Sequence, residues 1–153
     1  QTHTYDMCYY ANVPDFIWKS TDELYRKESF QHFIDLDLYA KEFKARGEKP
    51  NWDPDRAKFF KKYNLPTTAG RAPWRVQELA DKVAEITKKL KDKKLSSDEH
   101  RALQGQWLLN AGTLVHDVGD LGQPLHVTSD RGGKSRGGRA RGAVSQLSTF
   151  QSR

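Results

Sequence analysis

Cysteine is nearly absent from this 153-residue chain, and long apolar runs are missing from it. Because Cys8 is the only cysteine, no disulfide can form within the chain, and cysteine pairing gives no information on the redox compartment. We expect Cys8 to be a buried thiol beside Tyr9 and Tyr10. No stretch of apolar residues reaches the length needed to span a bilayer, so we expect no transmembrane segment.

Strand signals are also scarce, because branched residues hardly ever alternate with a period of two. Helix signals recur instead. Three helix starts are marked by capping-box spacing of Ser20 with Glu23 and of Ser96 with Glu99, and by Asp53 followed by Pro54. The chain is long enough for one domain with a core. The sequence therefore predicts an all-α, multi-helix, bundle-like domain.

Acidic residues are missing from the end of the chain, after Asp130. Residues 131–153 carry six basic residues and no acid, which accounts for the whole formal charge of +6. The remaining body is neutral and does not provide the clustered Lys and Arg of a broad nucleic-acid surface. From Lys134 onwards the composition is rich in Arg, Gly and Ser, so we expect residues 134–153 to be a disordered tail.

Apolar spacing marks a helix from Pro73 to about Leu90, because apolar residues recur there at steps of three and four. The segment from Lys41 to Leu65 is interrupted by glycine and prolines, which favours a long connection with one short helix near residues 59–63.

A longer helix is expected from Ser97 onwards, and its residues fall on three faces. The predicted apolar face consists of Trp107, Ala111, Leu114, Val115 and Val118, and the predicted polar stripe consists of Gln106, Asn110, Thr113 and Asp117. The third face holds Leu109, Gly112, His116, Gly119 and Asp120. Its two glycines flank two potential metal ligands and leave room for another element or an ion to approach.

Three residues of the metal-ligand type lie on and just after this helix. His116 and Asp120 are four residues apart, which points both side chains the same way, about one turn apart. Gln123 and Pro124 end the helix, so that His126 lies on the following turn, back over the helix end. One short segment thus presents three residues that can bind a metal ion.

The string from His116 to His126, HDVGDLGQPLH, resembles the most diagnostic motif of the zinc-dependent single-strand nucleases and zinc-dependent phospholipases C. Two earlier segments look like the upstream ligand segments of that family, in the expected order and with broadly similar spacing. They are Pro14 with Asp15, and the run from Gln31 to Asp35. The resemblance covers roughly residues 10–133. It implies a phosphodiester hydrolase with a multinuclear zinc centre.

In that family one zinc is held by an Asp, two His and an Asp that is shared with a neighbouring zinc. The resemblance assigns these metal ligands to Asp15, His32, His116 and Asp120, which makes one site complete, and His126 matches the first ligand of another zinc. It further implies that the metals activate water for attack on phosphorus, with Asp120 bridging two ions as the catalytic residue and with no protein nucleophile.

Phe33 and Asp35 match substrate-binding positions of the nuclease branch. There the aromatic side chain stacks on a nucleobase and the carboxylate hydrogen-bonds it, which suits single strands. Two alternatives stay open. Phe33 can belong to the core, as we expect for Phe30, and Asp35 can be an acceptor that orients His32.

Two of the assigned ligands also have alternative interpretations. Asp15 follows Pro14 and can be a turn or N-cap aspartate, and His32 can be a partly buried histidine. Parts of the family's ligand set have no counterpart. No histidine follows His126, no acid follows Asp130, and the N-terminal Trp and His of the third zinc are missing. A reading-frame break near Gly133 would explain both the lost ligands and the composition of the tail.

We therefore expect residues 1–133 to form an incomplete, all-α, zinc-dependent nuclease or phospholipase C-like domain. By itself this domain is expected to bind zinc weakly and to have little or no hydrolase activity. The favoured substrate is single-stranded nucleic acid. The alternatives are a phospholipase C acting on phospholipid headgroups and a helical domain without catalysis. The resemblance also implies a secreted or periplasmic protein, and we expect a monomer.

Overall fold

The computed structural model describes residues 4–18, 28–49, 52–66 and 68–130. Within these residues the order of elements is α1 (Thr4–Phe16), η2 (Ser29–Gln31), α3 (Leu36–Arg46), α4 (Arg56–Tyr63), α5 (Ala72–Lys89), α6 (Ser97–Leu121) and η3 (Pro124–His126). The prediction of an all-α fold is confirmed. None of the described helices combines the length and apolar character required to cross a bilayer. The predicted tail, residues 134–153, and the predicted capping box at residues 20–23 lie outside the described residues.

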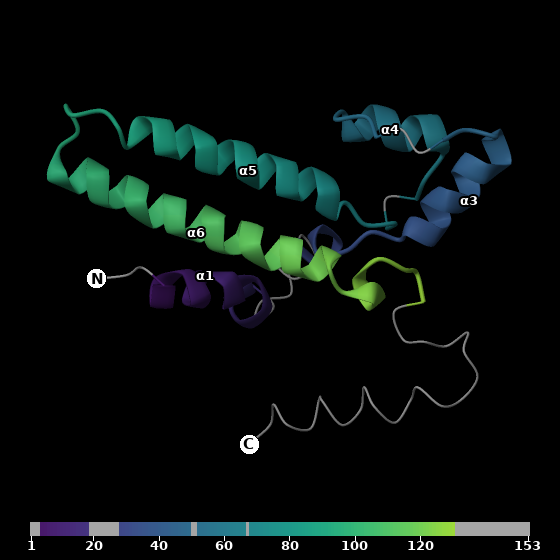
Figure 1. Ribbon diagram of the computed structural model, residues 1–153, viewed down its shortest axis with the longest axis horizontal. Helices are drawn as coiled ribbons and strands as arrows, with labels where there is room; N and C mark the ends of the chain where they lie inside the picture. Colours follow the sequence, from purple (N-terminus) through teal and green to yellow (C-terminus); the bar gives the residue numbers. More distant parts are fainter. Residues whose placement is uncertain (1–3, 19–27, 50–51, 67, 131–153) are drawn as a thin grey trace, which may run out of the picture.

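Helices α5 and α6 form a long antiparallel hairpin (Figure 1). Helix α6 begins with the predicted capping box, in which the Ser96 side chain accepts from the Glu99 amide and the Ser96 amide donates to Glu99 Oε2 at 2.8 Å. Across the hairpin, Trp107 Nε1 donates to Thr87 Oγ1 at 2.9 Å. Both helices were predicted, and their bounds agree with the prediction to within one residue at the start of each.

Helix α1 lies along the other side of α6 (Figure 1), and a glycine permits its close approach. A Cβ atom added at Gly112 would lie only 2.5 Å from Tyr10 Cβ. Val13 and Pro14 of α1 are buried, whereas Cys8 is exposed. The expectation of a buried thiol is therefore wrong, because the face of α1 that turns toward α6 carries Tyr10, Val13 and Pro14 and leaves Cys8 outside.

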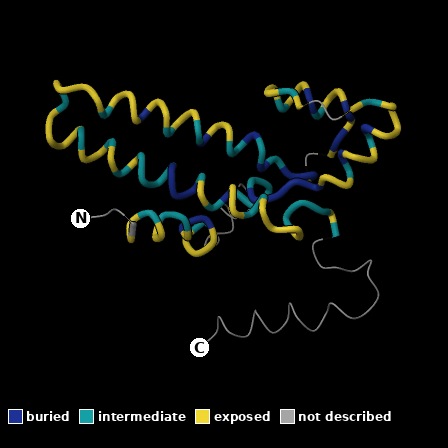
Figure 2. Tube along the Cα trace, in the orientation of Figure 1, coloured by how far each residue is buried: buried dark blue, intermediate teal, exposed yellow. Residues whose placement is uncertain are grey.

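An aromatic cluster connects α3, α4 and the start of α5. We use this name for the buried group Ile34, Tyr39, Phe43, Phe59, Tyr63, Leu65, Ala69 and Trp74. Its polar atoms have partners, since the Tyr39 hydroxyl donates to the Gly70 carbonyl at 3.0 Å and Trp74 Nε1 donates to the Asp53 carbonyl at 2.9 Å. Figure 2 shows buried residues gathered where the hairpin meets the segment that precedes α3.

The segment between residues 41 and 65 is more helical than its composition predicts. Helix α3 continues to Arg46 and ends at Gly47, whose φ of 64° suits a residue without a side chain. Helix α4 is capped by Asp55 and not by Asp53, because Asp55 accepts from the Lys58 amide at 3.1 Å. Asp53 instead closes the preceding turn by accepting from the Asp55 amide at 2.8 Å.

Candidate metal centre

Residues 32–35 connect η2 to α3, and main-chain hydrogen bonds fix them against two other parts of the chain. The Ile34 amide donates to the His126 carbonyl at 2.9 Å, and the Asp35 amide donates to the Ala69 carbonyl at 2.9 Å. Gly70, with a φ of 79°, lies so close that a Cβ atom there would be 2.2 Å from the Phe33 carbonyl oxygen. This segment therefore holds His32 beside the end of α6.

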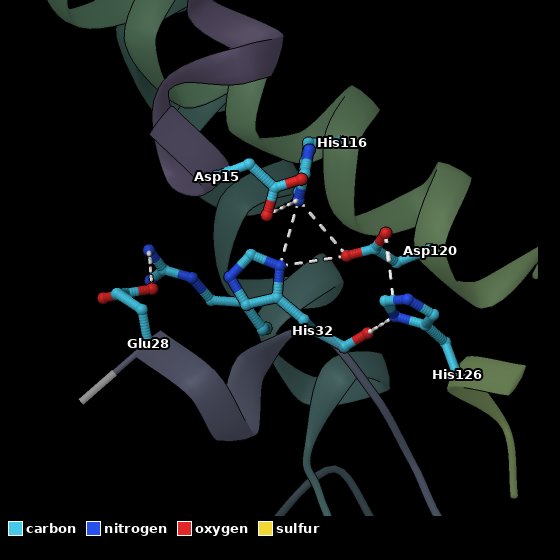
Figure 3. Close-up of polar contacts among 7 residues, drawn as sticks. Asp15, Glu28, His32, His116, Asp120 and His126 are labelled. Atoms are coloured by element: carbon cyan, nitrogen blue, oxygen red, sulfur yellow. Dashed lines mark hydrogen bonds and ion pairs between the residues drawn. The ribbon is translucent and has the colours of Figure 1, made fainter. Parts of the chain in front are cut away.

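Three of the predicted ligands come together tightly, and we call His32, His116 and Asp120 the ligand cluster (Figure 3). His32 Nδ1 lies 3.0 Å from His116 Nε2 and 2.9 Å from Asp120 Oδ2. His116 Nε2 lies 3.2 Å from the same carboxylate oxygen. The side chains of these residues are 9–15% exposed. Two elements that are 84 residues apart in sequence thus converge on one small volume.

The spacing of these three atoms is close to that of the ligands of one metal ion. In a tetrahedral zinc site with bonds of about 2.0–2.1 Å, neighbouring ligand atoms are roughly 3.3 Å apart. The three observed distances of 2.9, 3.0 and 3.2 Å are a few tenths of an ångström shorter. Imidazole nitrogen and carboxylate oxygen are both ligands that zinc accepts. The residues present therefore fit a zinc ion with small outward movements.

The other two predicted ligands, Asp15 and His126, lie at the edge of the cluster. Asp15 Oδ1 is 3.9 Å from His116 Nε2, and the Asp15 side chain is 44% exposed. Asp15 belongs to the last turn of α1, so the alternative of a turn or N-cap residue is wrong. His126 Nδ1 donates to the His32 carbonyl at 3.0 Å and lies 3.7 Å from Asp120 Oδ1.

Electrostatics within the cluster favour a charged carboxylate. Burial alone would raise the pKa of Asp120, but hydrogen bonds from His116 and His32 outweigh it and hold that pKa well below the usual range. Burial alone would lower the pKa of His116, yet its hydrogen bond to Asp120 raises it above the ordinary value. Without a metal, Asp120 therefore attracts a proton onto His116, and a cation can take the place of that proton.

Asp117 is a fourth member of this environment that sequence reasoning missed. A carboxylate oxygen of Asp117 lies within 4.8 Å of ligand atoms of His32, His116 and Asp120. Asp117 is 1% exposed, and burial raises the pKa of its carboxyl to about 6. The signal that could have found it is its position three residues before Asp120, on the same side of a helix.

The faces predicted for α6 are partly wrong near its end. Thr113 and Asp117, assigned to the polar stripe, are buried at 2% and 1% exposure. Val115 and Val118, assigned to the apolar face, are 55% and 52% exposed. The reason is that α6 lies between α5 and α1 (Figure 1), so two sides of the helix are covered and the sequence pattern alone does not identify them.

The two residues predicted to bind substrate are buried in this structure. Phe33 is 7% exposed and Asp35 is 4% exposed. The Phe33 ring lies 6.1 Å from the Phe30 ring, and its segment is covered by Gly70. A role of Phe33 and Asp35 in substrate binding stays a prediction, and it would require this segment to open.

Comparison with known proteins adds no relative to this picture. No protein-family model matches the chain, no curated protein matches it, and no solved structure matches its fold. The resemblance to zinc-dependent nucleases and phospholipases C consequently depends on the motif residues alone. The fold and the site define an all-α domain with a candidate metal centre.

Proposed function

We propose that this chain is a zinc-dependent phosphodiester hydrolase domain that acts on single-stranded nucleic acid. One observation carries the proposal: the donor atoms of His32, His116 and Asp120 lie 2.9 to 3.2 Å from one another in a largely buried cluster. Two histidines and a carboxylate at such distances form a ligand set for a divalent ion, and the motif that contains two of them resembles that of zinc phosphodiesterases.

Asp120 has the central part in this proposal because its two oxygens face different neighbours. Oδ2 faces His32 and His116, whereas Oδ1 faces His126 at 3.7 Å. Arranged in this way, Asp120 would be able to hold more than one metal ion. When bound, zinc supplies a Lewis acid that offsets charge on a phosphodiester and lowers the pKa of water. The protein's own contribution is to keep Asp120 ionised and both imidazoles oriented toward it.

Zinc binding by this chain is expected to be weak. Asp15, the remaining ligand of the resemblance, stands 3.9 Å from His116 and is 44% exposed. We therefore expect an affinity below that of structural zinc in finger peptides, for which binding contributes about 10–16 kcal/mol at pH 7. Hydrolysis by the chain alone is expected to be slow for the same reason.

The test combines zinc binding with product analysis on the full chain. Zinc affinity is measured by competition with a chromophoric chelator, for the wild type and for His116→Ala. Zinc-loaded protein is then incubated with single-stranded DNA, double-stranded DNA and phosphatidylcholine vesicles, and released nucleotides and phosphocholine are quantified. We expect nucleotide release from single strands that requires zinc and that His116→Ala abolishes.

Three other results would change the proposed function or the proposed site. Release of phosphocholine without nucleotides would replace the nuclease with a phospholipase C, the alternative that the resemblance includes. Zinc that remains bound as tightly to His116→Ala as to the wild type would contradict the site itself. Absence of any zinc binding by the wild type would favour a helical domain without catalysis.

A further inference from the structure

We propose that Asp117 is a metal-ligating residue, so that the cation site of this chain is formed by His32, His116, Asp117 and Asp120. This inference rests on the proposed function, because it concerns the same site. It differs from the family resemblance, which assigns the remaining ligand to Asp15 and gives no role to Asp117.

Position on the helix is the first argument. Three potential ligands on one helix, at 116, 117 and 120, fall within an arc of about 100° at 100° per residue. Asp120 lies between the other two on this arc. A carboxylate oxygen of Asp117 is within 4.8 Å of the other ligand atoms, compared with about 3.3 Å in a tetrahedral zinc site. Binding a shared ion would require the Asp117 carboxylate to move toward the other ligand atoms.

An unsatisfied atom is the second argument. Among the described residues, Asp117 Oδ2 is buried and has no hydrogen-bond partner. Burying a carboxylate without a partner is costly, so such a group calls for a cation or a proton. Thr113, one turn earlier and equally buried, does not raise this question because its hydroxyl donates to the Leu109 carbonyl at 2.9 Å.

Arg75 of α5 is the rival explanation for this buried carboxylate, because its charge acts on Asp117. Its terminal nitrogens, however, face other acids, at 4.0 Å from Glu28 and 3.7 Å from Glu78. Among the described residues, Arg75 Nε also has no hydrogen-bond partner. Arg75 therefore leaves Asp117 Oδ2 without a hydrogen bond.

Charge balance is the third argument. A divalent ion in a buried site is compensated best by two carboxylates, with neutral imidazoles completing the ligand set. Asp117 and Asp120 provide these two charges in the interior. Asp15 would provide its charge from a side chain that is 44% exposed. The buried pair gives a neutral site without contribution from α1.

The experiment compares Asp117→Asn with the matched variant Asp15→Asn and with His116→Ala in the full chain. Zinc alone is the probe, and its affinity is measured by chelator competition. We expect Asp117→Asn to weaken zinc binding by at least about 10-fold, and by more than Asp15→Asn does. Thermal unfolding in EDTA is the second readout. There we expect Asp117→Asn to be as stable as the wild type or more stable, because the variant removes a buried unpaired charge.

Two outcomes would overturn the inference alone. The first is loss of zinc from His116→Ala while Asp117→Asn binds zinc as tightly as the wild type. The second is an Asp117→Asn variant that unfolds at a lower temperature in EDTA and loses no more zinc affinity than Asp15→Asn. If His116→Ala leaves zinc binding unchanged, the proposed function fails, and the role of Asp117 fails with it.

Discussion

The aromatic cluster and the ligand cluster share one short segment, residues 32–35, yet they depend on different side chains. Ile34 packs into the aromatic cluster, and His32 belongs to the ligand cluster. The aromatic cluster is held together by apolar packing and requires no bound ligand or ion. The ligand cluster brings together polar groups whose mutual attraction requires a proton or a metal ion. The comparison indicates that apolar packing forms the fold, and that the fold then presents the ligands.

We expect the greatest loss of stability when a buried aromatic ring is removed, and almost none when an exposed ring is removed. Phe59 is 1% exposed and Phe16 is 67% exposed. We expect Phe59→Ala to lower the free energy of unfolding by about 3–5 kcal/mol, because it leaves a cavity among aromatic neighbours. Phe16→Ala is the matched control and should change stability by no more than about 0.5 kcal/mol. Urea unfolding of the metal-free proteins measures both, and equal losses would contradict the assignment of the core.

A second comparison uses two glycines of α6. We expect Gly112→Ala to destabilise the fold by roughly 1–3 kcal/mol, because its Cβ atom would lie 2.5 Å from Tyr10 Cβ. Gly119→Ala meets nothing within 4 Å and should stabilise the helix by up to about 1 kcal/mol. Thermal unfolding distinguishes them. Equal effects of the two substitutions would mean that α1 does not press against α6 at Gly112.

His32, in the ligand cluster, and His126, at its edge, should differ in their importance for zinc binding. His32 Nδ1 lies 2.9 Å from Asp120, whereas His126 Nδ1 lies 3.7 Å from it. We expect His32→Ala to weaken zinc binding by more than about 100-fold and His126→Ala by about 10-fold or less. Chelator competition measures both values, with His100→Ala as a control away from the cluster. A larger loss from His126→Ala would shift the site toward η3.

The pH dependence of zinc affinity is expected to change least. Zinc needs the deprotonated imidazole, and the pKa of His116 is raised above the ordinary value of 6.5 because its hydrogen bond to Asp120 outweighs burial. Zinc affinity should therefore begin to fall at a pH above 6.5 as the solution is acidified. In Asp120→Asn the hydrogen-bonded charge is gone, and the fall should begin at a lower pH. Titration of zinc affinity from pH 8 to pH 5 measures both, and the same onset in the two proteins would argue against this coupling.

Much of the fold could be predicted from local chemistry. The capping box at Ser96 and the apolar steps after Pro73 define the hairpin helices because caps and helical periodicity act within one or two turns. Helix α3 was not predicted, and from Lys41 onwards the nearby Gly47 and Pro50 favoured a connection over a helix. Only the structure shows that α3 contributes Tyr39 and Phe43 to a cluster assembled from distant segments.

For the candidate site too, some residues could be predicted from the sequence and others could not. His116 and Asp120 could be paired from their spacing, because a helix dictates which side chains share a face. Asp117 could not be recognised as buried, since its environment depends on α5 and on the segment that carries His32. The exposure of Val115 and Val118 has the same origin, because the packing of neighbouring helices decides which face of α6 meets solvent.

X-ray absorption at the zinc edge tests directly whether His32, His116 and Asp120 bind one metal ion. For the zinc-loaded chain we expect scattering from two imidazoles, with nitrogen and oxygen ligands at about 2.0–2.1 Å. His116→Ala, loaded at the same protein concentration, should lose this pattern. A wild-type spectrum with oxygen ligands and no imidazole, or one that His116→Ala leaves unchanged, would show that these three residues do not bind the ion together.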